Sequence, residues 1–321
     1  MLARNAECLY WMGRYFERTG HLCRLLRWQV ESLVDRPIRE IHFGWYRIYG
    51  SLGRRLPGAD AELVGGGDDY MLVDSFALAD DLTFERANVD SVWNGFTFGR
   101  ENARQMRHHL SAEVWTNLNR AYLRFRKLRI EDIWKTAPET FYEGIAYDID
   151  GLAGAADATM YHDDAWRFLR MGRFSERAQL TIALILAHVA ATRKTGESLN
   201  DDWSSLLRVC QAVDVYRRRY GVAIRPHRVL DLLVTDERLP QSLTCGIDTV
   251  AAELSVINAA PGSSAELLRM ARSLADAIRG DWPDDTDLEH RERILNEQRQ
   301  AWRKLHGLVM DAYVRYPAED A

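Results

Sequence analysis

A seven-residue segment occurs twice in this chain, and its repetition constrains the fold more strongly than any other sequence feature. Residues 12–18 read Met-Gly-Arg-Tyr-Phe-Glu-Arg, and residues 171–177 read Met-Gly-Arg-Phe-Ser-Glu-Arg, 159 positions later. Internal similarity at a fixed offset is the sequence signature of a repeated architecture. We therefore expect two pseudo-repeated halves, residues 1–150 and 151–321, that form one compact duplicated domain.

Both copies lie in segments that have the hydrophobic period of an α-helix. At about 100° per residue, the apolar side chains of each segment fall on one stripe. The stripe of the first segment contains Leu9, Met12, Phe16, Cys23 and Val30, and that of the second contains Phe168, Met171, Ile182, Leu186 and Val189. Such a stripe indicates a helix with one buried face. We expect these helices over residues 5–34 and 165–191.

The rest of the chain also predicts helices, and alternating β-type runs are essentially absent. Ser91 and Ser242 precede helical patterns at corresponding places in the two halves, where each would cap a helix. Residues 54–69 predict a loop because glycine is concentrated there, and residues 130–154 predict a less regular segment broken by proline and glycine. The expected fold class is all-α, a helical bundle built from two pseudo-repeated halves.

The two copies keep their ionic residues identical while their apolar residues vary. Glu17 and Glu176 border the apolar stripe, and the arginines lie further round each helix: Arg14, Arg18, Arg173 and Arg177. One reading is a structural Arg–Glu network, in which Gly13 and Gly172 allow another backbone to approach closely and so offset their cost in a helix. The other reading is a pocket where paired arginines bind a carboxylate or phosphate with their forked donors.

A third Gly-Arg pair with an arginine four residues later, Gly99-Arg100 with Arg104, occurs in the first half alone. Arg100 and Arg104 share one helix face, and the corresponding helix of the second half has no counterpart of either. The first half should therefore contribute more to any site. The candidates for binding a ligand or partner are Arg14, Glu17, Arg18, Arg100, Glu101, Asn102, Arg104, Arg173, Glu176 and Arg177. No residue is assigned a catalytic role.

Composition and missing motifs argue against several functional classes. The formal net charge of −5 and the pI near 6.0 disfavour a general nucleic-acid-binding protein. No apolar run reaches about 18 residues, and the charged start does not resemble a signal peptide, so we expect a cytoplasmic protein without a membrane span. The four cysteines lack CxxC spacing, and no Gly-rich loop ends in Lys-Ser/Thr. We expect no metal and no cofactor.

Four motifs together resemble the alpha-E family of bacterial proteins. They are Leu-Ala-Arg-Asn-Ala-Glu at 2–7, Tyr-Trp-Met-Gly-Arg-Tyr-Phe-Glu-Arg at 10–18, Gly-Arg-Glu-Asn-Ala-Arg at 99–104 and Trp-Arg-Phe-Leu-Arg-Met-Gly-Arg at 166–173. The resemblance covers nearly the whole chain and implies an all-helical fold, but it implies no catalytic residues. Ser175 departs from the family pattern, where a larger apolar residue is usual, and we expect looser packing there.

The resemblance also implies a functional setting. Genes of this family often lie beside genes for a circularly permuted ATP-grasp ligase-like protein and for a transglutaminase-like peptidase. This setting implies an accessory or scaffold partner of an ATP-grasp-type ligase, in amide, peptide-bond or peptide-tag chemistry. The Arg- and Glu-rich helix faces would then serve for docking or for binding an anionic group.

Two alternatives stay open at this point. The chain could be an enzyme in its own right, with Glu17, Glu176 or Glu101 as general acid or base. An adjacent arginine lowers the pKa of a carboxyl group, however, and makes it a poor base near neutral pH. The other alternative is a purely structural helical homo-oligomer. Arginines saturated by carboxylates inside the fold would favour a structural network, whereas arginines facing an open cavity would favour a ligand site.

Overall fold

The structure, a computed structural model, describes residues 2–57, 68–195, 200–257, 263–283 and 287–314. Within these ranges the chain forms fourteen α-helices and no strand, which confirms the all-α fold class. The helices are α1 (Ala3–Asp35), α2 (Ile38–Ser51), α3 (Asp68–Thr83), α4 (Val92–Gln105), α5 (Ala112–Phe125), α6 (Ile130–Trp134), α7 (Pro138–Thr159), α8 (Asp164–Thr195), α9 (Asn200–Val209), α10 (Val213–Tyr220), α11 (Pro226–Thr235), α12 (Leu243–Val256), α13 (Ser263–Asp281) and α14 (Leu288–Tyr313). A short 3-10 helix covers Arg107–His109.

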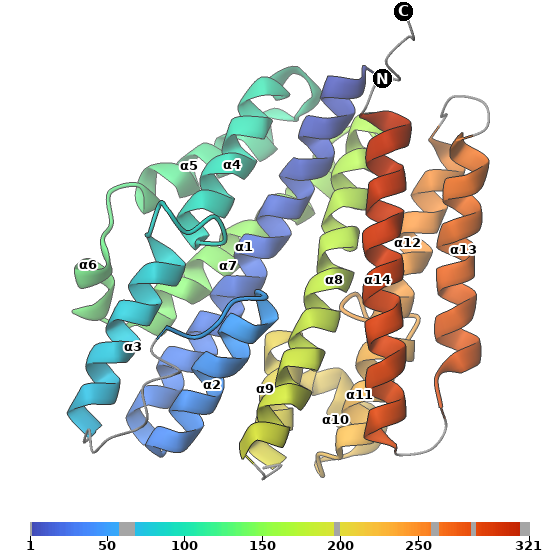
Figure 1. The fold of residues 1–321 in the computed structure, drawn as a ribbon. Coiled ribbons are helices and arrows are strands. Elements are labelled where there is room, and N and C mark those ends of the chain that lie inside the picture. The colour runs from blue at the N-terminus through green and yellow to red at the C-terminus, as the bar shows by residue number, and fades with distance from the viewer. Residues whose placement is uncertain (1, 58–67, 196–199, 258–262, 284–286, 315–321) are drawn as a thin grey trace, which may run out of the picture.

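The two helices that carry the repeated segment, α1 and α8, form the centre of the bundle (Figure 1). They are 33 and 32 residues long, lie side by side and run in the same direction. Helices α7 and α4 pack against α1, and helices α12, α2 and α14 pack against α8. The repeat helices are thus each other's main neighbours. That the two complete halves superpose stays a prediction.

Both of the predicted serine caps are present in the structure. The Ser91 hydroxyl accepts a hydrogen bond from the backbone N–H of Asn94 at 3.2 Å, at the start of α4. The Ser242 hydroxyl accepts one from the N–H of Cys245 at 3.0 Å, at the start of α12. Each cap satisfies a helix N–H group that has no carbonyl partner within the helix.

Two expectations about helix extent are wrong. The segment 130–154, expected to be irregular, is largely covered by α6 and by the 22 residues of α7. Pro138 occupies the start of α7, where a missing N–H breaks no hydrogen bond, and Gly144 faces open space. The amphipathic pattern that follows Ser111 also predicts a helix over residues 112–129, but in the structure this helix ends at Phe125. Of the loop expected over 54–69, residues 58–67 lie outside the described ranges.

The apolar stripes of α1 and α8 lie in one continuous core with side chains from the surrounding helices. Trp45 of α2 and Trp203 of α9 are both fully buried in this core. In the part of the chain that the structure describes, every helix is too short or too polar to cross a membrane.

Candidate functional site

The backbones of α1 and α8 touch at the two glycines of the repeated segment. A Cβ atom added to Gly13 would collide with the carbonyl oxygen of Leu169, and one added to Gly172 would collide with the carbonyl oxygen of Tyr10. The two contacts are reciprocal, because Leu169 and Tyr10 each lie three residues before the glycine of their own helix. Glycine is needed at both positions because any side chain would force the helices apart.

Ion pairs cross the α1–α8 interface in the same reciprocal way. Glu176 of α8 accepts hydrogen bonds from Nε of Arg14 at 2.5 Å and from Nε of Arg18 at 2.7 Å, and both arginines belong to α1. Nη1 of Arg14 also lies 3.0 Å from Nδ1 of His306 on α14. Nη1 of Arg18 lies 3.5 Å from a carboxylate oxygen of Asp90.

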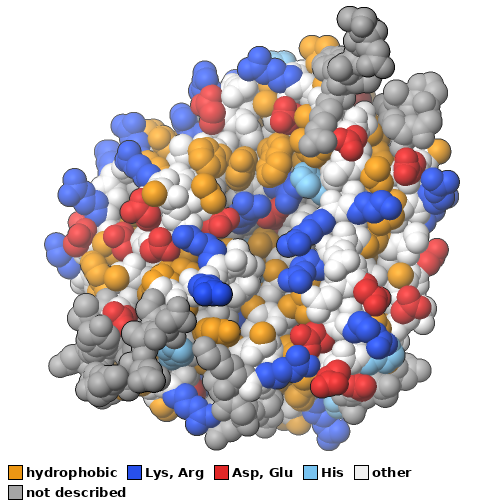
Figure 2. Space-filling model, viewed as in Figure 1, with side chains coloured by type: hydrophobic (Ala, Val, Ile, Leu, Met, Phe, Trp, Pro, Cys, Tyr) orange, Lys and Arg blue, Asp and Glu red, His pale blue; other side chains and the backbone are white. Residues whose placement is uncertain are grey.

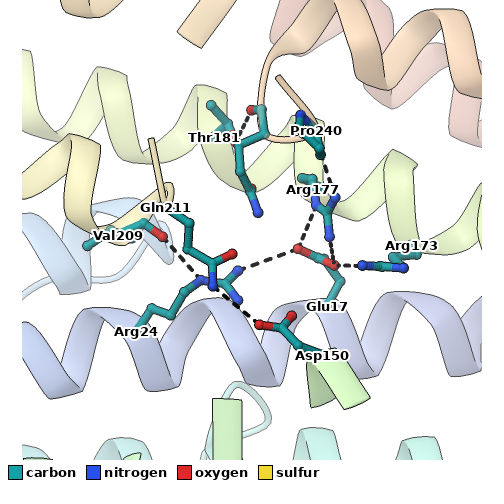
Figure 3. A network of polar contacts seen from close by, with 10 residues as sticks. Glu17, Arg24, Asp150, Arg173, Arg177, Thr181, Val209, Gln211 and Pro240 are labelled. Atoms are coloured by element: carbon teal, nitrogen blue, oxygen red, sulfur yellow. Dashed lines mark hydrogen bonds and ion pairs between the residues drawn. The ribbon is translucent and has the colours of Figure 1, made fainter. Parts of the chain in front are cut away.

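Glu17 of α1 is held by arginines of α8 (Figure 3). Arg177 donates two hydrogen bonds to the Glu17 carboxylate, at 2.9 and 2.7 Å, and Nε of Arg173 lies 3.4 Å from the same group. A further arginine of α1, Arg24, places Nη2 at 3.5 Å from Glu17 Oε1. Arg177 also donates to the carbonyl oxygen of Pro240 at 3.2 Å. Each repeat helix therefore neutralises the glutamate of the other.

Both glutamates are buried and remain ionised. Burial alone raises the pKa of Glu17, but the charges of Arg177, Arg173 and Arg24 outweigh it and hold that pKa far below its usual range. Burial likewise raises the pKa of Glu176, and the guanidinium groups of α1 lower it by more. A carboxylate this firmly ionised and this well bonded does not exchange protons near neutral pH. The interface has the character of a structural network.

The arginines of the repeat are more deeply placed than the sequence suggests. Arg14 and Arg177 are 5% and 4% exposed, which is as low as the glutamates, although they were expected to lie further round the helix from the core. The reason is that α8 covers this side of α1 as well as the apolar stripe. Arg18 and Arg173 are only partly buried, with side chains 24% and 25% exposed. Arg173, together with Glu17 and Arg170, also lines a small cavity of about 40 Å³ between α1, α7 and α8, and a ligand role for these residues stays a prediction.

The candidate residues of α4 do not join the α1–α8 interface. Nε and Nη2 of Arg100 donate to the side-chain oxygen of Asn119 at 3.0 and 2.9 Å, and its guanidinium lies 4.3 Å from the ring centre of Tyr122. Arg100 thereby links α4 to α5. Arg104 forms an ion pair with Glu101 of its own helix at 2.7 Å, on the surface. The arginines of α1 and α4 thus bind different partners and do not line one site.

Glu101 and Asn102 instead line a pocket of about 370 Å³ between α1 and α4. Its other lining residues are Arg4, Glu7, Cys8, Trp11, Tyr15, Phe98 and Gln105. The rings of Trp11 and Tyr15, and those of Tyr15 and Phe98, have centroids 5.5 Å apart and form an aromatic wall. Figure 2 shows hydrophobic side chains gathered at the surface between the upper parts of α1 and α4. We call this the α1–α4 pocket.

The α1–α4 pocket and the α1–α8 interface meet at Trp11. The guanidinium carbon of Arg14 lies 4.7 Å from the centre of the Trp11 ring, in a cation–π contact, while the same arginine binds Glu176. The Trp11 indole, which forms part of the pocket wall, therefore packs against the buried Arg14–Glu176 ion pair.

Several site residues were missed by sequence reasoning. Arg24 has no counterpart in the second half, where Ala183 occupies the corresponding position, so a comparison of the repeats does not reveal it. Its spacing of seven residues from Glu17, two helical turns, places both on one face and could have indicated it. His306 comes from the last helix, and no pattern in the sequence points to it. Within the described ranges, no three His, Cys, Asp or Glu side chains are grouped so that they could hold a metal ion.

The fold and the site define an all-helical domain with Glu-Arg pairs at its centre, at residues 17–18 and 176–177. The chain belongs to the Alpha-E family, whose model matches residues 1–314 and is described as a predicted alpha-helical domain with a conserved ER motif. This confirms the resemblance.

The chain is also similar to an uncharacterised protein of Mycobacterium bovis and to uncharacterised proteins from two strains of Mycobacterium tuberculosis. It is 24% identical to each over 316 residues, and the alignments cover 94% of this chain and 35% of each relative. The chain thus spans about a third of the length of these relatives. No solved structure gives a significant match.

Proposed function

We propose that the chain is an accessory or scaffold subunit of an ATP-grasp-type ligase, acting in amide, peptide-bond or peptide-tag chemistry. A transglutaminase-like peptidase would be a second partner, and the cytoplasm, where ATP is available, would be the location. The mycobacterial relatives support a role as one module among others, because the region similar to this chain makes up 35% of their length. The ligase class itself comes from the family resemblance.

The observation that carries the proposal is the make-up of the α1–α4 pocket. Residues from the motifs at 2–7, 10–18 and 99–104, which are far apart in the sequence, converge on this one surface. Aromatic side chains and arginines are enriched at protein interfaces, and the Phe98 side chain on this wall is 41% exposed. The arginines of the repeat are already bound to Glu17 and Glu176, so we assign docking to this pocket and not to them.

The alternative of an enzyme in its own right has less support from the geometry. Glu17 and Glu176 are buried and ion-paired. Glu101 is more accessible, but its hydrogen bonds from Arg104 lower its pKa as well. None of the three carboxylates has the raised pKa that a general acid or base needs near neutral pH.

The proposal is tested by co-expressing the tagged chain with the ATP-grasp-type protein and measuring how much of that protein copurifies. We expect a stoichiometric complex with the wild type and a loss of at least about tenfold with Phe98→Ser, because an aromatic anchor at the centre of an interface contributes more than about 1.4 kcal/mol. Leu123→Ser is the matched control, since Leu123 is a similarly exposed apolar residue on α5 outside the pocket.

Melting temperatures of the free variants exclude an effect through unfolding. If the wild type forms no complex, or if Phe98→Ser and Leu123→Ser weaken it equally, docking through the α1–α4 pocket is wrong.

A further inference from the structure

A second pocket, of about 270 Å³, lies between α1, α7 and the turn that joins α9 to α10. It shares no lining residue with the α1–α4 pocket. Its wall combines both charge signs with two aromatic rings: Arg24, Arg27, Arg208, Glu31, Glu143, Asp150, Trp28 and Tyr147. We call it the α1–α7 pocket.

Part of this charge is neutralised within the wall itself. Arg27 binds Glu31 at 2.9 Å and Glu143 at 2.7 Å, so these three side chains form a closed group along one side. They are partly exposed, and such pairs contribute little to stability. The groups available to a ligand are therefore the remaining ones.

Two guanidinium groups of the pocket lack a fully bonded anionic partner. Arg24 is 8% exposed, and its Nε donates to the carbonyl oxygen of Val209 at 3.1 Å. Its Nη2 forms an ion pair with Glu17 at 3.5 Å but has no hydrogen-bond acceptor. A buried donor without an acceptor is costly. Arg208 lies 4.8 Å from the ring centre of Trp28 and has no described carboxylate within ion-pairing distance.

One carboxylate of the pocket lacks a cationic partner in the same way. Asp150 of α7 accepts a hydrogen bond from the neutral side-chain amide of Gln211 at 3.2 Å, and none of the described ion pairs includes it. Figure 3 shows Asp150 and Gln211 beside the guanidinium of Arg24, which also faces Glu17. Opposite charges that are not neutralised by each other therefore face one small space.

Gln211 lines the α1–α7 pocket and has an unfavourable backbone conformation. Its φ is 51°, in the left-handed region, and it ends α9 in a Schellman-type turn in which Ala212 N–H bonds to the carbonyl oxygen of Leu207 at 2.8 Å. This position is usually glycine, because a Cβ atom is unfavourable in the left-handed region. What the glutamine contributes in return is the amide that reaches Asp150.

We propose that the α1–α7 pocket binds a small zwitterion that carries one carboxylate and one ammonium group, the chemistry of a free amino acid or a dipeptide. The carboxylate lies between Arg24 and Arg208, the two guanidinium groups of the wall that lack a fully bonded anionic partner. The ammonium group lies against Asp150. The apolar part of the ligand rests on Trp28 and Tyr147. The inference stands independently of the proposed role beside a ligase.

The test is calorimetric titration of the full chain with free L-amino acids and with glycylglycine. We expect saturable binding of at least one of them. The N-acetylated form of the tightest ligand, which lacks the ammonium group, and its amide, which lacks the carboxylate, should each bind at least about tenfold more weakly. A preference for glycylglycine over its free amino acid would identify a peptide as the source of the zwitterion. Absence of saturable binding, or equal binding of the blocked forms, overturns the proposal.

Two variants distinguish a loss of ligand binding from a loss of stability. Arg208→Ala removes an exposed arginine that takes no part in the α1–α8 interface, and we expect binding at least about tenfold weaker at an unchanged melting temperature. Gln211→Gly suits the left-handed turn, so the variant should be at least as stable as the wild type yet bind several-fold more weakly. Arg218→Ala, an exposed arginine of α10 outside the pocket, is the control. Wild-type affinity in folded Arg208→Ala overturns the assignment.

Discussion

Glu17 and Glu176 are the two residues on which the centre of the molecule depends. Together they lie within ion-pairing distance of five guanidinium groups, those of Arg14, Arg18, Arg24, Arg173 and Arg177. Positive charge is therefore in excess at the α1–α8 interface. Removing a glutamate leaves several buried cations without a partner, whereas removing one arginine leaves the glutamate with another.

Glu17→Gln should lower the free energy of unfolding by about 3–5 kcal/mol, because it strands Arg177 in a buried position. Arg18→Ala should cost less, because Glu176 keeps its bond to Arg14. Chemical denaturation measures both. Arg104→Ala, a surface arginine paired only within its own helix, is the control and should leave the denaturation midpoint unchanged. A loss in Glu17→Gln no larger than in Arg104→Ala would contradict this account.

The contribution of Glu17 to the free energy of unfolding should depend on pH. The folded pKa of Glu17 lies below its ordinary value of 4.5, so its stabilising contribution is complete above about that pH and is lost as pH falls below it. The wild type should therefore lose stability steeply below pH 4.5. Glu17→Gln has no such group to protonate, and the stability difference between the two proteins should shrink with acid. A constant difference from pH 7 to pH 3 would argue against a buried ionised carboxylate.

At the scale of single residues, the sequence indicated which residues form the ion pairs of the α1–α8 interface but not which residue pairs with which. The identical ionic residues of the two copies pointed to Glu17, Glu176 and their arginines. A helical projection places each residue around its own helix, yet it contains no information on which helix covers it. The depth of Arg14 and Arg177, and the pairing between the two repeats, follow from the contact of α1 with α8. His306 enters from a third helix, which no local pattern describes.

At the scale of elements, the parallel contact of α1 with α8 depends on two glycines. Gly13 and Gly172 lie within long helices, where a glycine costs about 1 kcal/mol relative to alanine. Each faces a backbone carbonyl group of the other helix, which cannot move aside as a side-chain tip could. The cost in helix propensity is offset by the close approach that lets the ion pairs form on both sides.

Gly13→Ala and Gly172→Ala should each destabilise the protein by about 1–3 kcal/mol through overpacking, in spite of the better helix propensity of alanine. Gly154→Ala is the matched control, because this glycine of α7 faces open space. It should stabilise the protein by about 0.5–1 kcal/mol. Thermal and chemical unfolding of the three variants provide the comparison. Equal effects at Gly13 and Gly154 would mean that the helices do not touch as described.

Helix existence was predictable from a periodic apolar stripe at α1 and α8, and from a helical pattern preceded by a capping serine at α4 and α12. It was not predictable at α7, where Pro138 and three glycines resembled breaks. Those glycines meet no other group in the folded chain, and the proline stands at the first position of the helix. Only the tertiary placement of α7 against α1 and α5 distinguishes a tolerated glycine from a helix end.

At the scale of the whole molecule, the two parts of the chain are joined by mutual neutralisation. The contacts of the α1–α8 interface lie 156–162 positions apart in the sequence. Neither part alone contains the partners of its own glutamate, apart from Arg24 beside Glu17. The molecule should therefore unfold as one cooperative unit, although it consists of two similar stretches of sequence.

Cleavage between α7 and α8, at the exposed Tyr161, provides the test. We expect residues 1–160 and 161–321, produced separately, to lack a cooperative thermal transition, and a mixture of the two to regain helical circular dichroism and a single transition. A mixture in which the first fragment carries Glu17→Gln should reassemble poorly. Cooperative unfolding of either fragment alone would show that the halves are independent domains.

The parallel packing of α1 and α8 also has a consequence during translation, because the two helices are synthesised far apart in time. Glu17 and Arg177 are 160 positions apart. At about 5–20 residues per second, a ribosome delivers the second of them roughly 8–32 s after the first. During that interval the growing chain contains α1, but α8, which covers the apolar stripe and the Glu17 carboxylate of α1, has not yet been synthesised. The nascent protein is therefore most exposed to aggregation in the middle of its translation, and the arrival of α8 ends that exposure.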